Sequence, residues 1–424
     1  MIDIKLLRED PKAVIKDLKR RSGVDTDIVD KILKVDAKFR EEKGELDKLK
    51  AAKNKESKAI AKVKKDGGDI KGQLAKVKGI SLEISNKDTE LKQIEEKRDT
   101  LLMKIPNILD PQVPKGADEE GNKPIRFSLE KPKFDFKIKN HQELCELNDW
   151  FDLEQAAKVS GARFYYLKKE LALLQVNLYA YVLNKLVEKG YTAMDVPPML
   201  RRDSLGRSVS LDDFEDVIYK IEKEDLYLIA TAEPALAALH QDQTLNPNQL
   251  PLKYAGLSTC FRKESGVTKD SKGIFRVHNF NKIEQFIFCK PEDSDKLHDE
   301  IIANAEEIFK ELEIHFRVVD ICTGDIGSFA ARKYDIEAWL PAQGKYREMV
   351  SASNYRDYGA RRLNTRYQSE DGTLKLVHTL NSTAIALTRC LIAIIETHQT
   401  KDGNVKLPKV LRPYFGGRKH LVNR

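Results

Sequence analysis

The feature that most constrains the fold is a pair of heptad repeats separated by a glycine turn. Apolar side chains recur at heptad spacing from Ile28 onward, and a second such series ends at Ile105. Between them lies Asp66-Gly67-Gly68-Asp69, a composition typical of a turn. The pattern predicts two helices that pair as an antiparallel coiled-coil hairpin over about residues 28–105. With about 38 residues per helix the arm would be roughly 55–60 Å long, and it should project into solvent.

The positive charge of the chain is concentrated in the distal part of this arm. The 424 residues carry a formal net charge of +7, but residues 48–78 alone hold 11 lysines and 3 acids, a net of +8. The rest of the chain therefore sums to −1. A local excess of this size favours contact with a polyanion, and a solvated helical face is the alternative. The candidate contact residues are Lys48, Lys50, Lys53, Lys55, Lys58, Lys62, Lys64, Lys65, Lys71, Lys76 and Lys78.

The sequence divides into an N-terminal domain over residues 1–110, a linker over 111–135 and a larger domain over 136–424. The linker is predicted because proline, glycine and charge occur there without periodicity. In the larger domain short β-rich runs alternate with helical patterns, which predicts an α+β fold with an antiparallel sheet. The helices are expected at 166–188, 293–313 and 383–398, and Asp10-Pro11 should begin a short helix near the N-terminus.

Several classes of protein and site are excluded or disfavoured. No run of about 18 apolar residues is present, so a membrane span is not expected, and the charged N-terminus has no apolar core of a signal peptide. The 5 cysteines are widely spread, which favours neither a disulfide framework nor a zinc cluster and fits the reducing cytoplasm. There is no glycine-rich phosphate loop and no G-x-G-x-x-G before a helix, so any nucleotide site is of another type.

The most informative stretch is a predicted strand hairpin that carries charge where a core face would be apolar. Arg262 and Glu264 share the parity of one strand, and Arg276, Phe280 and Glu284 share the parity of the next. The polar segment 265–273 would join the two strands. Burial of so many charges without a function is costly, so the hairpin is a candidate site, with an exposed salt-bridged hairpin as the alternative.

These residues resemble a known family. Phe261-Arg262-x-Glu264 followed by Arg276-x3-Phe280-x3-Glu284 (about 257–289) is similar to motif 2 of class II aminoacyl-tRNA synthetases. Residues of about 377–398, from Leu380-Asn381-Ser382-Thr383 to Arg389, resemble motif 3, and about 190–200 resemble motif 1, the dimerisation element. The N-terminal MIDIKLLREDP, the arm, Thr231-Ala232-Glu233 and the closing VLRPYFGG narrow the resemblance to the seryl-tRNA synthetases, over essentially the whole chain.

The resemblance implies an activity and partners. The chain would be an ATP-dependent serine–tRNA ligase that forms seryl-adenylate and transfers serine to the 3′ end of serine tRNA. The arm would contact the long variable arm of that tRNA, and charging of a selenocysteine tRNA is left open. The enzyme would be a cytoplasmic homodimer that uses Mg²⁺ with ATP and needs no zinc.

The resemblance also implies roles for individual residues. Arg262 and Arg389 would be catalytic, and Glu348 and Ser351 would hold Mg²⁺ through hard oxygen atoms. The serine-binding residues would be Thr231, Ala232, Glu233, Arg262, Glu284, Asn381 and Thr383. The ATP-binding residues would be Arg262, Lys263, Glu264, Arg276, Val277, Phe280, Glu348, Met349, Val350, Ser351 and Arg389.

The chain departs from the family pattern after Glu348. Ala352 and Tyr355 stand where the family commonly has cysteine, and Gly359 stands where it has glutamine. One alternative is a catalytically impaired paralogue that acts as an RNA-binding module. It predicts loss of Arg262, Glu284 or Arg389, and all three are present. An amino-acid:carrier-protein ligase would lack the arm, and a purely structural coiled coil would not explain the charged hairpin.

Overall fold

A computed structural model describes residues 1–210, 216–264 and 273–422, so most of the predicted 265–273 loop lies outside the described residues. The chain divides into two units. One comprises Met1–Lys19 and Gly23–Pro106, and the other comprises Arg20–Ser22 and Asn107–Arg424. The predicted boundaries at 110 and 135 stay a prediction.

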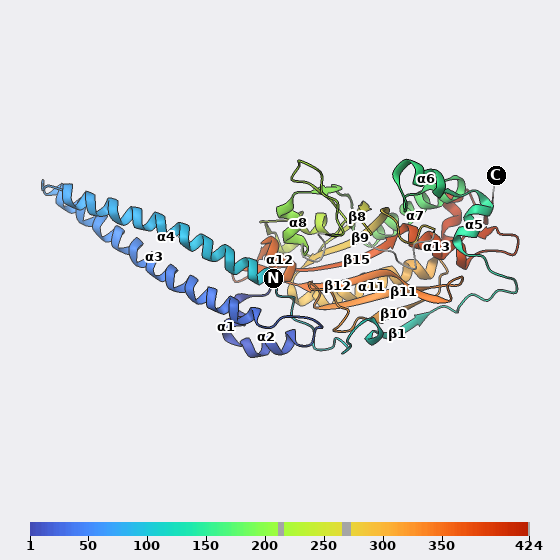
Figure 1. Ribbon diagram of the computed structural model, residues 1–424, viewed down its shortest axis with the longest axis horizontal. Coiled ribbons are helices and arrows are strands. Elements are labelled where there is room, and N and C mark those ends of the chain that lie inside the picture. Colours follow the sequence, from blue (N-terminus) through green and yellow to red (C-terminus); the bar gives the residue numbers. More distant parts are fainter. Residues whose placement is uncertain (211–215, 265–272, 423–424) are drawn as a thin grey trace. The chain divides into compact units, whose positions relative to one another are not determined.

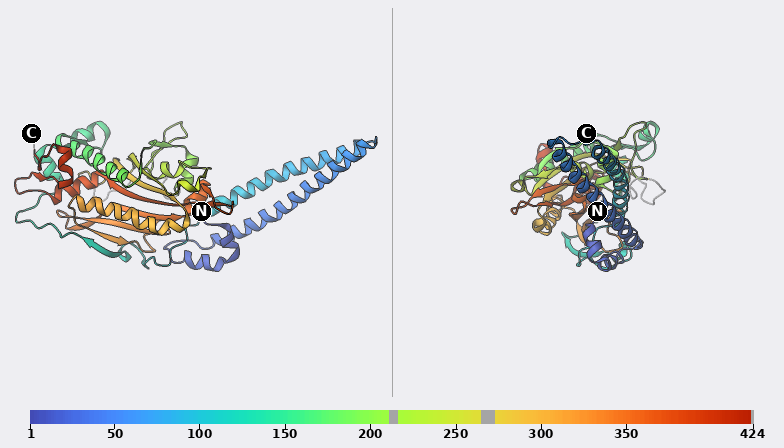
Figure 2. Two further views of the ribbon diagram at one scale, coloured as in Figure 1. Left: turned by 180° about the vertical axis from the view of Figure 1, so that it is seen from behind. Right: turned by 90° about the vertical axis from the view of Figure 1, so that its left-hand side faces the viewer.

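The N-terminal unit is a helical hairpin preceded by two short helices. Its helices are α1 (Ile4–Glu9), α2 (Pro11–Leu18), α3 (Ile28–Lys65) and α4 (Lys71–Met103). The side chain of Asp10 accepts a hydrogen bond from the Ala13 amide, and Pro11 occupies the first turn, so α2 begins where the sequence predicted. Helices α3 and α4 run antiparallel along their length (Figures 1 and 2), which confirms the predicted coiled-coil arm.

The seam of the arm is buried at its base and more exposed toward its turn. Ile32, Leu46 and Ile94 are buried, whereas no residue of the arm between Leu46 and Ile94 is buried. Lys87 occupies a seam position and forms ion pairs across the seam with acids of α3. Charged groups at seam positions fix the register of two helices at a cost in stability. The two helices therefore pack less tightly toward the tip of the arm than at its base.

A sheet organises the larger unit. Among the described residues it has eight strands, and all neighbours are antiparallel except β4 and β8, which are parallel. This arrangement confirms the predicted α+β class. In spatial order the strands are β1 (Lys123–Ser128), β10 (Phe316–Asp320), β11 (Arg332–Leu340), β12 (Lys345–Arg356), β15 (His378–Ala386), β9 (Asn279–Cys289), β8 (Leu252–Phe261) and β4 (Thr192–Asp195).

Helices and short strands complete this unit. The helices are α5 (His141–Asn148), α6 (Leu153–Ser160), α7 (Lys169–Glu188), α8 (Arg202–Ser208), α10 (Glu233–Ala238), α11 (Ser294–Glu311), α12 (Tyr358–Leu363) and α13 (Leu387–Thr397). The short strands are β2 (Phe151–Asp152), β3 (Tyr166–Leu167), β5 (Met199–Leu200), β6 (Tyr227–Leu228), β7 (Thr244–Leu245), β13 (Arg366–Gln368), β14 (Leu374–Leu376), β16 (Val405–Lys406) and β17 (His420–Leu421).

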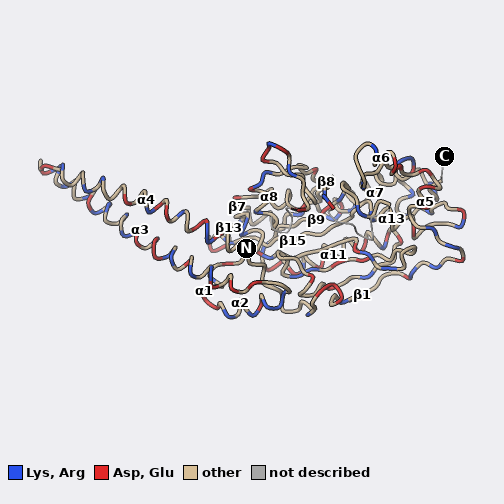
Figure 3. Tube along the Cα trace, in the orientation of Figure 1, with Lys and Arg blue, Asp and Glu red and all other residues tan. Residues whose placement is uncertain are grey.

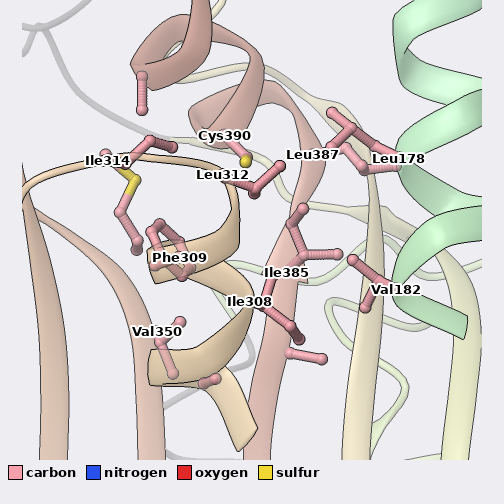
Figure 4. Packing of buried hydrophobic residues seen from close by; sticks show 14 of the residues in the cluster. Leu178, Val182, Ile308, Phe309, Leu312, Ile314, Val350, Ile385, Leu387 and Cys390 are labelled. Carbon is pink, nitrogen blue, oxygen red and sulfur yellow. The ribbon is translucent and has the colours of Figure 1, made fainter. Parts of the chain in front are cut away.

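The main core lies between the sheet and helices α7, α11 and α13. Leu178, Ile308 and Leu387 from these helices meet Ile385 and Val350 from the strands, all in one buried cluster (Figure 4). On β9, odd-numbered residues such as Ile283 belong to this cluster, whereas Phe286 and Phe288 belong to a second cluster with residues of α10 and α12. Alternation along a strand sends neighbouring side chains to opposite faces. The even-numbered face of β9 is therefore the one that can carry a site.

Two expectations about elements need correction. The predicted helix over 383–398 begins only at Leu387, because residues up to Ala386 continue strand β15. The predicted linker 111–135 contains β1, which pairs with β10 at an edge of the sheet. Ile125 and Phe127 alternate with polar neighbours in β1, a period-2 signal that the high proline and charge content masked. The helices predicted at 166–188 and 293–313 are present as α7 and α11.

Candidate active site

The hairpin of β8 and β9 carries the predicted motif 2 residues, although not all of them within its strands. Strand β8 ends at Phe261 and β9 begins at Asn279, so Arg262, Glu264 and Arg276 lie in the connecting segments. The strand-parity argument is wrong for these three residues. Phe280 and Glu284 do lie in β9, opposite Cys260 and Gly256 of β8. Backbone turns rather than strand alternation therefore bring the arginines toward the site.

Eight of the eleven predicted ATP-binding residues line one cavity of about 270 Å³, and Lys263, Val350 and Ser351 do not. The guanidinium carbon of Arg262 lies 5.1 Å from the ring centroid of Phe280, and Arg276 approaches Glu264 at 3.5 Å. Arginine forks and an aromatic face are groups that bind phosphates and a flat base. The residues lining the cavity are Arg262, Glu264, Phe275, Arg276, Val277, Phe280, Lys282, Glu348, Met349, Thr383, Ala386, Thr388 and Arg389.

Arg389 of the predicted motif 3 reaches this cavity because β15 runs directly into α13. It is the third residue of α13, and its guanidinium donates a hydrogen bond to the backbone oxygen of Glu348 at 2.8 Å. Burial lowers the pKa of Arg389, and so do the neighbouring cations Arg262 and Arg276, while Glu348 opposes both effects. An arginine of such high ordinary pKa remains charged, so the cavity concentrates positive charge that suits a polyphosphate.

A β-bulge places the two predicted metal ligands on one face of β12. Residues three apart in a regular strand point to opposite faces. Here Ile336 pairs with Val350 and Glu337 pairs with Glu348, so Met349 is an extra residue in β12. The bulge restores Glu348 and Ser351 to a common face. Strand parity alone could not have predicted this bulge.

The chemistry of this pair fits Mg²⁺. The Glu348 side chain is 51% exposed, so an ion could reach it. Desolvation of the Glu348 carboxyl group raises its pKa. The positive charges of Lys333, Arg389 and Arg262 outweigh this effect, so the pKa of Glu348 is lowered. An ionised carboxylate next to a hydroxyl gives the hard oxygen ligands that Mg²⁺ prefers.

The residues predicted to recognise the serine hydroxyl form a buried polar cluster. Glu284 is 1% exposed and stands opposite Thr383 in the pairing of β9 with β15. Thr231 donates a hydrogen bond to Glu284 at 3.2 Å. Lys282 donates to Thr231 at 3.1 Å and also forms an ion pair with Glu284. Such a cluster offers a ligand both donors and acceptors in a buried place.

Lys282 is a site residue that the sequence analysis missed. It has the same parity as Phe280 and Glu284 in β9, and this parity could have identified it. It lines the nucleotide cavity and contacts Thr231, which lines a second cavity of about 410 Å³. Lys282 and Thr231 thus form the wall that the two cavities share.

The second cavity contains Glu233, the predicted ligand for the substrate ammonium. Glu233 begins α10, and its Oε1 accepts a hydrogen bond from the Tyr355 hydroxyl at 2.8 Å. Burial and the nearby charge of Glu284 raise the pKa of Glu233 to about 7. Lys333 and Ser351 line the same cavity, and Lys333 lies 3.3 Å from Asp335. Lys333 and Asp335 were not predicted, because only the register of β11 with β12 brings them to this face.

Some predicted residues lie near the cavities without offering a side chain to them. Val350 is completely buried in the main core and Ala232 in the second cluster, so only their backbone could touch a ligand. Lys263 is exposed, and its amide donates to the backbone oxygen of Val217 at 2.7 Å. Asn381 is 4% exposed, and its Nδ2 has no hydrogen-bond partner in the part of the chain that the structure describes.

The arm lysines do not form one uniform surface, although they recur along both helices (Figure 3). Lys50 pairs with Asp88 at 3.2 Å, Lys76 pairs with Glu56, and Lys53 is partly buried at the seam. Six other candidate lysines of α3 are exposed, and five of them, all except Lys64, are spaced by seven, three, four and three residues. That spacing puts them on the outer face of α3, away from the seam. This lysine stripe consists of Lys48, Lys55, Lys58, Lys62 and Lys65.

Metal, membrane and disulfide features add little to the site. In the described ranges no group of three or more His, Cys, Asp or Glu side chains could hold a metal ion. No helix there is long and apolar enough to cross a membrane. All five cysteines are buried and free.

Comparison with known proteins identifies relatives over the whole length. The model of the seryl-tRNA synthetase N-terminal domain matches residues 1–109, and that of the tRNA synthetase class II core domain (G, H, P, S and T) matches residues 217–398. A serine–tRNA ligase of Pyrococcus horikoshii is 47% identical over 98% of this chain and 96% of its own.

Solved structures agree with this assignment. The crystal structure of seryl-tRNA synthetase from Pyrococcus horikoshii complexed with ATP is 47% identical, covers 100% of both chains and has a TM-score of 0.91. Cytoplasmic serine–tRNA ligase from Naegleria fowleri in complex with AMP is 35% identical, with a TM-score of 0.87 over 100% of this chain and 99% of that one.

An antiparallel sheet that presents motif 2 and motif 3 arginines to one cavity defines a class II aminoacyl-tRNA synthetase. The likeness over both units is more specific. The chain belongs to the seryl-tRNA synthetase family, and it is an ATP-dependent serine–tRNA ligase that binds ATP, serine and tRNA. These comparisons support the ligase and not the impaired paralogue that the departures at Ala352, Tyr355 and Gly359 had left open.

Proposed function

We propose that the two adjoining cavities activate serine and that the lysine stripe of the arm holds the tRNA. The observation that supports the first part is that residues from separate segments of the chain meet at one site. Arg262 after β8, Glu284 in β9, Thr383 in β15 and Arg389 in α13 come from four separate segments of the chain to one site. The ATP of the solved relative is in keeping with this assignment.

Serine would bind across the shared wall of the cavities. Its ammonium would lie against Glu233 and Thr231, and its hydroxyl would contact Glu284 and Thr383. A site built around a hydroxyl rejects alanine strongly, because the buried polar groups would otherwise lose their partner. Threonine would be excluded by its additional methyl group.

Adenylate formation needs no general base, because the serine carboxylate is already ionised at neutral pH. One carboxylate oxygen attacks the α-phosphorus of ATP, the bond to the bridging oxygen breaks, and pyrophosphate leaves. Arg262 would orient the carboxylate and the α-phosphate, and Arg389 would hold the γ-phosphate while negative charge develops. A ribose hydroxyl at the 3′ end of the tRNA then attacks the activated carbonyl, and AMP leaves.

Glu348 and Ser351 would hold Mg²⁺, since their oxygen atoms share one face of β12. The ion would neutralise charge on the phosphates of ATP. The side chains of Glu264 and Arg276 would contact the nucleotide, and Phe280 would stack on its base.

A homodimer is the assembly we propose. Helix α7, which precedes the motif 1 strand β4, exposes Leu173 by 49%, Val176 by 61% and Val187 by 48%. These residues lie on one side of the helix, and β4 is an edge strand of the sheet. An apolar stripe beside an open edge favours an interface with a second copy of the chain. The five free cysteines support a cytoplasmic location.

Serine-dependent exchange of pyrophosphate into ATP tests the assigned site. Exchange should require serine and should be far weaker with alanine or threonine, and the same protein should then charge serine tRNA, whose long variable arm would meet the lysine stripe. Charging of a selenocysteine tRNA by the same preparation would extend the partner range. Exchange supported equally by alanine would contradict the proposed hydroxyl pocket.

A further inference from the structure

We propose that Tyr355 is a positioning residue for the amino-acid substrate, because its hydroxyl holds the carboxylate of Glu233 where the substrate ammonium binds. The inference rests on the proposed role of Glu233 and goes beyond it by assigning a function to a position at which this chain departs from its family pattern. Tyr355 does not touch the reacting atoms.

The backbone of β12 aims Tyr355 at the site. Asn354 pairs with Leu380 of β15 and Arg356 pairs with Thr379, so Tyr355 is an extra residue in the strand. A bulge of this kind turns a side chain away from the direction that regular alternation would give it. The Tyr355 ring also lies edge-on to Phe329, with 5.6 Å between centroids. Bulge and ring contact together fix where the hydroxyl can be.

The hydroxyl then makes a defined contact in the substrate cavity. It donates to Oε1 of Glu233 at 2.8 Å, and both residues line the cavity of about 410 Å³. This hydrogen bond orients one carboxylate oxygen and leaves Oε2 for a ligand. A cysteine, the residue of the family pattern at this position, is too short to span the same distance, so the contact depends on the tyrosine.

The charges around Glu233 give the contact a measurable consequence. Burial and Glu284 of β9 raise the pKa of Glu233, whereas the Tyr355 hydroxyl and Lys282 of β9 lower it. Loss of the hydroxyl therefore makes Glu233 harder to ionise near neutral pH. A neutral carboxyl group attracts an ammonium much less than a carboxylate does.

The test is Tyr355→Phe, measured by pyrophosphate exchange as a function of serine concentration and pH. We expect KM for serine to rise about tenfold at pH 7, with KM for ATP unchanged. The acid limb of kcat/KM for serine should move to higher pH, because that limb reports ionisation in the free enzyme. The matched control is Tyr346→Phe, which removes a hydroxyl of the same strand that hydrogen-bonds His315, and it should change neither quantity.

Two further variants separate the possible outcomes. Replacement of Tyr355 by 3-fluorotyrosine preserves its shape and makes the hydroxyl a stronger donor, so the acid limb should move to lower pH even if Tyr355→Phe does not fold. Glu233→Gln should raise KM for serine and abolish the effect of the hydroxyl on the pH profile. If Glu233→Gln binds serine normally, the proposed role of Glu233 is wrong. If Glu233→Gln weakens serine binding while neither Tyr355 variant moves KM or the acid limb, only the inference about Tyr355 fails.

Discussion

Neutralising the lysine stripe should weaken tRNA binding without affecting serine activation. The variant changes Lys48, Lys55, Lys58, Lys62 and Lys65 to Gln, all of them exposed on the outer face of α3. The stripe spans 17 residue steps, or roughly 25 Å along the helix, a length over which several phosphates can be contacted.

The magnitude follows from counterion release. Each phosphate contact contributes about 0.9 to the slope of log K against log salt on a duplex, so five contacts contribute about 4.5. Raising the salt about fourfold, from roughly 50 to 200 mM, should therefore reduce the tRNA affinity of the unaltered protein about 500-fold more than that of the variant. The assay is tRNA binding across a salt series, together with aminoacylation and pyrophosphate exchange. Aminoacylation should suffer through KM for tRNA, and exchange should be unchanged.

A matched control removes the same charge from the same unit. The control changes five exposed lysines outside the stripe to Gln, namely Lys5, Lys12, Lys16, Lys19 and Lys34. If the stripe variant and the control variant reduce the salt slope equally, or if neither changes it, the stripe is only a solvated face and the arm binds tRNA elsewhere.

Arg262→Ala should lower the rate of pyrophosphate exchange by roughly 10²–10³-fold. An unchanged rate would mean that this cavity is not the site of serine activation. Thr383→Ala should reduce the preference for serine over alanine, whereas equal losses for both amino acids would give Thr383 a structural role. Burial raises the folded-state pKa of Glu233 from 4.5 to about 7, so stability falls as pH rises through this range. Glu233→Gln should thus stabilise the fold by about 1–3 kcal/mol at pH 8 and not at pH 4.5, as measured by denaturant titration. Val176→Glu on α7 should convert a dimer to a monomer in sedimentation, and a variant that stays dimeric would place the interface elsewhere.

Local patterns predicted the elements better than they predicted the site. The heptads defined the arm, and Asp10-Pro11 defined the start of α2, because both signals depend only on neighbours along one helix. Strand parity correctly paired Phe280 with Glu284. The same argument failed for Arg262, Glu264 and Arg276, since nothing in the sequence marks where β8 ends and β9 begins.

The site depends on irregularities that no periodic rule contains. The extra residue at Met349 turns Glu348 toward the face of Ser351, and a second bulge aims Tyr355 at Glu233. Lys333 reaches the cavity only through the register of β11 with β12. A bulge is an irregularity in the pairing of two strands, so the pattern of one strand alone does not reveal its position.

By itself the sequence determined the arm, the separation of its basic charge from the rest of the chain, the α+β class and, through motif resemblance, the family. These are properties of local periodicity and composition. The tertiary structure alone decided which lysines face outward and which pair across the seam, and how strand β12, with its two bulges, meets the hairpin of β8 and β9. It also decided that Tyr355, which departs from the family pattern, contacts the carboxylate of Glu233. Such contacts join residues more than a hundred positions apart, and only the packing of the sheet fixes the distance between them.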